Sequence, residues 1–188
     1  MTTLRVLLGE HWPEPAAAKW VLLDDSGQIL RTGEGEPRNW PPAERIEAVL
    51  NGPQANWVKV RVPRASTREQ EQALGFALEE QLVREADSQH LTPSQKGEES
   101  WNVIVITRER LKRLQAQFEA ISKPLDSAFV ITQALPAETE AWTIAPCEDF
   151  LIVRTQAHEG WVEDLDNQTP SLLASALYAA REAGSQPA

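Results

Sequence analysis

The stretch Trp57–Leu82, WVKVRVPRASTREQEQALGFALEEQL, contains two different hydrophobic periods. Valine alternates with other residues over Trp57–Val62, which is the two-residue period of a strand buried on one face. Ser66 and Glu69 then fit a capping box, and the sequence predicts a helix from Ser66 to about Ala86. Leucines recur at four-residue spacing on that helix: Leu74, Leu78 and Leu82. A strand that leads directly into an amphipathic helix favours an α/β fold.

Strand and helix patterns also precede this stretch. Three strands are predicted near the N-terminus: Leu4–Leu8, Lys19–Asp24 and Gln28–Thr32. Asp25-Ser26-Gly27 supplies turn residues for a hairpin between the second and the third of them. Pro41 and Pro42 predict the start of a helix, which Asn51-Gly52-Pro53 would end. The apolar face of that helix would hold three residues: Ile46, Val49 and Leu50.

After the opening stretch, strands become more frequent. Thr92–Ser100 is polar and contains proline and glycine, so it predicts a loop. Trp101–Ile106 is a nearly continuous apolar run, typical of a central strand, and Thr107 caps a helix that extends to about Ile121. Four strands and a final helix follow: Phe129–Thr132, Ala141–Ile144, Phe150–Arg154, Trp161–Glu163 and a helix that begins at Thr169-Pro170. The alternation predicts an α/β fold with a mixed sheet.

Composition limits the class of protein. The chain has 188 residues, a net charge of −10, 41% hydrophobic and 24% charged residues, which indicates one folded domain or two small lobes. It contains no run of 18 apolar residues that could cross a bilayer. The acidity lies mostly in residues 126–188, which hold ten acids and two bases. This balance opposes nucleic-acid binding and favours either solubility or a basic protein partner.

Few residues form a pattern typical of catalysis. Gly33-Glu34-Gly35 lacks a third glycine and places an acid where a phosphate would sit. His11, His90 and His158 have no metal-ligand spacing. Cys147 has no neighbouring histidine or base, which favours a small half-buried residue over a nucleophile. The sequence therefore predicts no catalytic residue, no metal ion and no cofactor.

Tryptophan is frequent, with seven residues in the chain. Four of them fall in or beside predicted strands, where core packing is expected: Trp57, Trp101, Trp142 and Trp161. Trp12 and Trp40 lie in proline-rich segments. They either cover the end of the sheet or, if exposed, anchor a protein partner.

Ala73–Leu82, ALGFALEEQL, resembles the signature of general secretion pathway protein L, the GspL family of type II secretion systems. Further similarities follow in the order of the family, so that the resemblance covers most of residues 57–165: Trp101–Ile106, Ala134-Leu135-Pro136, Trp142-Thr143-Ile144, Phe150–Arg154 and Gly160-Trp161. Two positions depart from the family pattern. Gly75 stands where proline is common, and Leu91 follows His90 where an aromatic residue is common.

The resemblance implies an actin-like (ribonuclease H-like) lobe with a mixed sheet, plus an inserted α/β subdomain. We expect three segments. Residues 1–64 would form the first strands and helix of the lobe, 65–124 the inserted subdomain, and 125–188 the start of a second lobe. The resemblance further implies that the chain corresponds to the N-terminal portion of such a protein, whose single membrane helix lies outside this sequence.

The resemblance also implies a function. The chain would be a non-enzymatic adaptor on the cytoplasmic side of the bacterial inner membrane, and it would dock the secretion ATPase through the N-terminal domain of that ATPase. Other inner-membrane secretion components, and a second copy in a homodimer, are further implied partners. We expect partner contacts on the Thr67–Ala86 helix and on the acidic C-terminal region: Glu79, Glu80, Arg84, Glu163 and Asp164.

Two other functions stay open as hypotheses. One is a nucleotide-binding actin-like ATPase of the pilus-assembly type. Actin-type folds bind phosphate with Asp-x-Gly hairpins, but Gly9–Pro13 and Gln156–Gly160 lack this motif, and Asp25-Ser26-Gly27 lies in a hairpin that a tight turn explains. The other is a small acidic enzyme on a different α/β scaffold, for which the sequence indicates no reaction.

Overall fold

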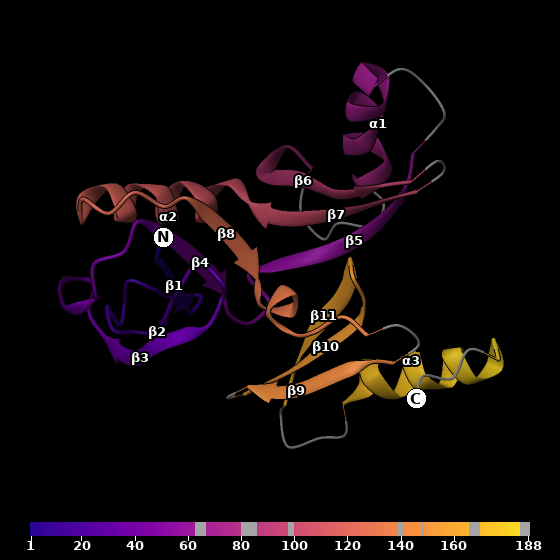
Figure 1. Ribbon diagram of the computed structural model, residues 1–188. Helices are drawn as coiled ribbons and strands as arrows, with labels where there is room; N and C mark the ends of the chain where they lie inside the picture. The colour runs from indigo at the N-terminus through magenta and orange to yellow at the C-terminus, as the bar shows by residue number, and fades with distance from the viewer. Residues whose placement is uncertain are drawn as a thin grey trace.

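The computed structural model describes residues 1–62, 67–79, 86–97, 100–138, 141–147, 149–165 and 170–184, which form three β-sheets with flanking helices (Figure 1). The first sheet has the order β3-β2-β1-β4-β8: β1 (Thr3–Leu8), β2 (Ala18–Leu23), β3 (Ile29–Gly35), β4 (Arg45–Leu50) and β8 (Ser127–Val130). β1, β2 and β3 are antiparallel, whereas β4 is parallel to both β1 and β8. The predicted mixed sheet is therefore confirmed.

The second sheet is antiparallel and has the order β5-β7-β6: β5 (Ala55–Arg61), β6 (Gln89–Lys96) and β7 (Ser100–Thr107). Helix α1 (Thr67–Glu79) packs on one face of it, because Leu74 and Leu78 are buried against Val60 and Trp101. The leucine spacing predicted correctly which face of this helix is buried. Ser66 and residues 80–85, also part of the predicted helix, lie outside the described residues.

The third sheet is antiparallel and has the order β11-β10-β9: β9 (Thr143–Cys147), β10 (Phe150–Gln156) and β11 (Glu159–Asp164). The predicted strands Phe150–Arg154 and Trp161–Glu163 are confirmed, and they pair as a hairpin in which Gln156 lies opposite Glu159. Helix α3 (Ser171–Glu182) follows and lies beside this sheet (Figure 1). Gly184, with φ +68°, adopts the left-handed conformation typical just after a helix end. The short 3-10 helices are η1 (Pro37–Asn39), η2 (Ala86–Ser88) and η3 (Ile131–Ala134).

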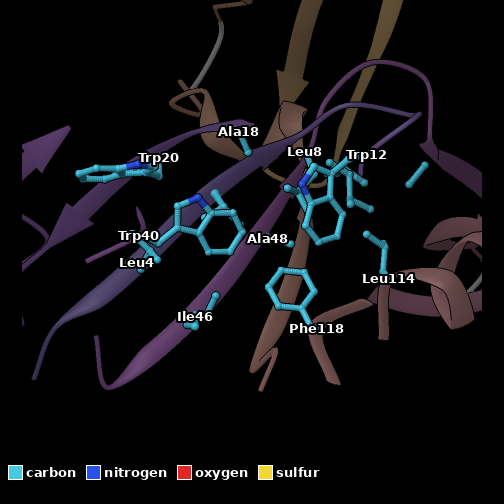
Figure 2. Close-up of a cluster of buried hydrophobic side chains, with 14 of the residues drawn as sticks. Leu4, Leu8, Trp12, Ala18, Trp20, Trp40, Ile46, Ala48, Leu114 and Phe118 are labelled. Atoms are coloured by element: carbon cyan, nitrogen blue, oxygen red, sulfur yellow. The ribbon is translucent and has the colours of Figure 1, made fainter. Parts of the chain in front are cut away.

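The main hydrophobic core lies between the first sheet and α2 (Arg108–Ala120), as Figure 2 shows around Phe118. Trp12 and Trp40 are only 3% and 5% exposed, and their ring centroids lie 5.4 and 6.2 Å from that of Phe118. Their indole N–H groups donate to the carbonyls of Ala16 and Gly35 at 3.2 and 2.9 Å. Their burial contradicts the alternative in which they are exposed partner anchors.

Helix α2 begins as the sequence predicts. The Thr107 hydroxyl oxygen accepts the backbone N–H of Arg110 at 3.2 Å, so Thr107 is its N-cap. Leu114 and Phe118 on the core side are 0% and 1% exposed. The four-residue spacing therefore places this face of the helix against the first sheet.

The helix predicted after Pro41 and Pro42 is wrong, because residues 45–50 form strand β4. Ile46, Ala48 and Leu50 alternate into the core, and β4 lies between β1 and β8 in parallel pairing. The sequence of residues 45–50 also fits a helix, but pairing with a strand on each side makes this segment extended, so that alternate side chains enter the core.

The loop predicted over Thr92–Ser100 is also wrong for Thr92–Lys96, which belongs to β6, and for Ser100, which begins β7. β6 lies at the edge of the second sheet and pairs with β7, with a register shift between Pro93 and Gln95. An edge strand tolerates a proline and exposes polar side chains, which explains why its composition predicts a loop.

The chain enters and leaves the first sheet more than once. β5 follows β4 directly but pairs with β7, and β8 returns to β4 after the second sheet and α2. The division into residues 1–64, 65–124 and 125–188 stays a prediction.

Candidate functional site

A cleft of about 530 Å³ opens where the second sheet meets α2 and the loop after β1. We call it the α2 cleft. Its apolar lining from β5 and β7 consists of Val58, Val105 and Ile106. The other residues of the lining, mostly polar or charged, are Glu10, His11, Pro53, Gln54, Asn56, Gln89, Thr107, Glu109, Arg110 and Arg113. The volume lies within the range of ligand-binding pockets in proteins.

Arg110 forms the inner wall of the α2 cleft and is 9% exposed. Its two terminal guanidinium nitrogens donate to the carbonyls of Trp12 and Gly9 at 2.9 and 2.8 Å, and its Nε donates to Gln54 Oε1 at 2.8 Å. Burial lowers the pKa of Arg110, the positive charge of Arg113 lowers it further, and the negative charge of Glu10 raises it. The hydrogen bonds from Arg110 to the carbonyls of Gly9 and Trp12 hold the β1–β2 loop against α2.

The β1–β2 loop presents the wrong groups to a phosphate. A phosphate site needs backbone N–H donors that converge on the anion, with glycines that allow close approach. Here the carbonyl oxygens of Gly9 and Trp12 converge on Arg110 instead, and Glu10 adds a negative charge to the cleft. Gly33-Glu34-Gly35 lies within β3 and forms no loop at all.

The predicted partner-binding residues lie on separate elements. Glu79 is the last residue of α1, and Glu80 and Arg84 lie outside the described residues. The Glu163 carboxylate is buried and accepts the N–H groups of Leu172 and Leu173 at the start of α3, at 2.6 and 3.0 Å. Asp164 is exposed at the end of β11. A partner-binding role for this set stays a prediction.

Sequence reasoning missed the role of Arg110. The sequence shows four cations at the start of α2, which are easily interpreted as a solvated surface: Arg108, Arg110, Lys112 and Arg113. The signal that sets Arg110 apart is its spacing. It lies four and eight residues before Leu114 and Phe118, so it lies on the buried stripe of the helix.

His158 and Cys147 each lie close to a polar side chain. His158 Nδ1 lies 2.9 Å from Ser94 Oγ, and Cys147 Sγ lies 3.8 Å from Asn51 Oδ1. Within the ranges that the structure describes, no group of three or more histidine, cysteine, aspartate or glutamate side chains could hold a metal ion. Among these same residues, no helix combines the length and the apolar character needed to cross a membrane.

Fold and site together define a class of protein. The first sheet is a mixed α/β sheet of the actin-like type, and its β1–β2 loop turns carbonyl oxygens inward. The family model described as "Type II secretion system (T2SS), protein L" matches residues 43–182. The chain therefore belongs to the type II secretion system protein L family, and the resemblance seen in the sequence is confirmed.

Known relatives agree with this assignment. The type II secretion system protein L of Klebsiella pneumoniae is 26% identical over 179 residues, which covers 88% of this chain and 45% of that protein. The protein L of Pectobacterium carotovorum subsp. carotovorum is 22% identical over 187 residues, which covers 92% of this chain and 44% of that protein. The chain thus spans less than half the length of these relatives.

A solved structure supports the fold. The cytoplasmic domain of EpsL, an inner membrane component of the type II secretion system of Vibrio cholerae, matches with a TM-score of 0.82 at 18% sequence identity. The match covers 95% of this chain and 77% of that chain. This similarity confirms the predicted actin-like α/β architecture.

Proposed function

We propose that the chain is a non-enzymatic adaptor on the cytoplasmic side of the bacterial inner membrane, and that it docks the secretion ATPase through the N-terminal domain of that ATPase. Membership of the protein L family supports a role inside a secretion system. The similarity to a domain described as cytoplasmic, from an inner membrane component, supports the location. Other inner-membrane secretion components and a second copy of the chain are further proposed partners.

The main observation in support of a non-enzymatic role is the set of hydrogen bonds that Arg110 donates. In an actin-like ATPase the first hairpin must offer donors to phosphate, whereas here its carbonyls at Gly9 and Trp12 are bonded to a guanidinium. Turning N–H groups of the loop toward a phosphate would break the bonds from Arg110 to Gly9 and Trp12, and a buried carbonyl left without a donor costs about 1–3 kcal/mol. A fold that fixes its own loop in this way supports a scaffold rather than a nucleotide enzyme.

The docking surface that we propose includes the end of α1 and the end of β11. Glu79, Glu80 and Arg84 stay the proposed contacts in the first region. In the second region the carboxylate of Glu163 is engaged by α3, so the proposed contact rests mainly on the exposed Asp164. Exposed charges of this kind set the association rate and the choice of partner.

Isothermal titration calorimetry with the N-terminal domain of the cognate secretion ATPase tests the docking. We expect saturable binding to the wild-type chain, and Asp164→Lys weakens it about tenfold because the substitution reverses a charge at the proposed surface. Glu119→Lys is the matched control, since Glu119 is an exposed acid on α2, away from the proposed surface. A wild-type chain that melts cooperatively but releases no heat with this domain would refute the docking.

Thermal melting with Mg-ATP tests the non-enzymatic part separately. A ligand that binds only the native state raises the melting temperature in proportion to RT ln(1 + [L]/Kd). We expect the same melting temperature with and without Mg-ATP. A clear rise would instead favour the nucleotide-binding actin-like ATPase.

A further inference from the structure

The α2 cleft uses a face of the second sheet that α1 covers only in part. Val58 on β5 and Val105 on β7 belong to the face that α1 covers at its other end, through Leu74 and Leu78. Gln89, which is 5% exposed, places its side chain at the same cleft. The cleft thus combines apolar side chains with a buried amide, which is the composition of a binding site for part of another molecule.

Positive charge concentrates beside this cleft in a chain whose net charge is −10. Residues 108–113 at the start of α2 contain four cations and one acid. Glu109 is the acid, and its place in the first turn of the helix is favourable to the helix dipole. A negatively charged partner would be attracted to this edge of the cleft, whereas the acidic residues 126–188 would repel it.

Arg113 is the second arginine, beside Arg110, in the lining of the α2 cleft. It lines the cleft, its side chain is exposed, and in the part of the chain that the structure describes it forms no hydrogen bond or ion pair. The positive charge of Arg113 lowers the pKa of Arg110, whereas the negative charge of Glu10, another residue of the cleft lining, raises it. Glu10 therefore offsets the buried Arg110, and a carboxylate from outside would offset Arg113.

We infer that the α2 cleft binds a segment of a protein partner that carries an acidic side chain next to an apolar one. A carboxylate of that segment accepts hydrogen bonds from the Arg113 guanidinium, and a neighbouring apolar side chain packs on Val58 and Val105. A nucleotide phosphate would meet carbonyl oxygens of the β1–β2 loop rather than converging N–H donors, because Gly9 and Trp12 turn their carbonyls toward Arg110. The inference rests on the proposed adaptor function, for which it names a second docking surface and the chemistry that this surface recognises.

Nuclear magnetic resonance titration of the ¹⁵N-labelled chain tests this inference without any particular natural partner. The probe is a ten-residue peptide in which glutamate alternates with leucine, and the control peptide has lysine in place of glutamate. We expect saturable shifts of the amides of Val58, Gln89 and Val105 with the acidic probe only. Added salt weakens the binding, since the Debye length is about 10 Å at 0.1 M and about 3 Å at 1 M.

Variants on α2 sharpen the test. Arg113→Glu weakens binding of the acidic probe about tenfold or more, since it replaces a charge-assisted hydrogen bond with repulsion, and Arg113→Lys loses less. Lys112→Glu is the matched control with the same change of charge one residue away and outside the cleft lining, and it changes binding by about threefold at most. All these side chains are exposed, so circular dichroism melting should match the wild type.

Three results would overturn the inference: no saturable binding of the acidic probe, saturable shifts away from the cleft, or equal losses for Arg113→Glu and Lys112→Glu. None of them depends on the secretion ATPase. Failure of the proposed docking would appear in the calorimetric titration instead, so the two failures are distinguishable.

Discussion

Arg110 is a buried cation that donates its hydrogen bonds to uncharged acceptors. Its three acceptors are two backbone carbonyls and one side-chain amide, at 2.8–2.9 Å. Burial of a charge is unfavourable unless hydrogen bonds replace those lost to water, and these bonds also satisfy two carbonyls of the β1–β2 loop. The loop that an actin-like enzyme would use for phosphate is therefore held by one side chain from α2.

Arg110→Met should destabilise the chain by about 3 kcal/mol, because it removes three hydrogen bonds and leaves buried carbonyls without donors. Urea denaturation followed by circular dichroism measures this as a lower midpoint with an unchanged slope. Arg113→Met is the control on the exposed side of the same helix turn and should change stability by about 0.5 kcal/mol at most. Equal losses for the two variants would contradict the role assigned to Arg110.

The buried position of Arg110 was easier to predict from the sequence than the identity of its hydrogen-bond partners, although neither was predicted. The spacing to Leu114 and Phe118 places it on the buried stripe of α2, which local periodicity can indicate. Its acceptors on Gly9 and Trp12 lie 101 and 98 residues away in the chain. No local pattern encodes such a contact, since it depends on how the first sheet and α2 pack.

At the scale of elements, the strands and helices with their own start signals were predictable. Thr107 caps α2, and alternating valines define β5. β4 was not predictable, because Ile46, Val49 and Leu50 fit a helix while Ile46, Ala48 and Leu50 fit a strand. Its neighbours β1 and β8 decide between the two periods, and β8 is far along the chain.

Helix α3 depends on a cap from another element. Its N-cap residue, Pro170, makes no capping side-chain bond, and Glu163 from β11 accepts the N–H groups of Leu172 and Leu173 instead. Glu163→Ala should destabilise α3 by about 1–2 kcal/mol, through loss of the cap and of a negative charge at the helix N-terminus. Hydrogen exchange should show faster exchange of the Leu172 and Leu173 amides.

Asp164→Ala is the control for this prediction, because Asp164 is exposed and its side chain makes no hydrogen bond or ion pair with α3 within the described residues. It should leave the exchange rates of α3 near those of the wild type. Unchanged exchange in Glu163→Ala would show that α3 is held by other contacts.

At the scale of the whole molecule, a junction joins the second sheet to η3 and to the β10–β11 turn. Trp57 Nε1 donates to Thr132 Oγ1 at 2.8 Å. Lys59 Nζ pairs with Glu159 at 2.9 Å, and Ser94 Oγ lies 2.9 Å from His158 Nδ1. Because Thr132 is 3% exposed, its bond with Trp57 is the most shielded of the three.

Trp57→Phe and Thr132→Val should each destabilise the chain by about 1 kcal/mol, and the double variant should lose less than the sum of the two. The reason is that each single variant removes the same hydrogen bond and leaves one partner unsatisfied. Urea denaturation of the four proteins gives the coupling energy. Strictly additive losses would contradict a direct bond across the junction.

Lys59→Met, at the exposed ion pair, should lower the free energy of unfolding by about 1 kcal/mol at most.

The return of β8 to the first sheet has a consequence for folding during synthesis. β4 is complete at Leu50, but its second neighbour, β8, begins only at Ser127. A ribosome needs on the order of 4–15 s to add residues 51–126 at about 5–20 residues per second. Throughout that interval one edge of β4 is unpaired, while the second sheet has time to form first. The order of folding therefore differs from the order of the chain, and the N-terminal sheet is completed only after the segment inserted into it.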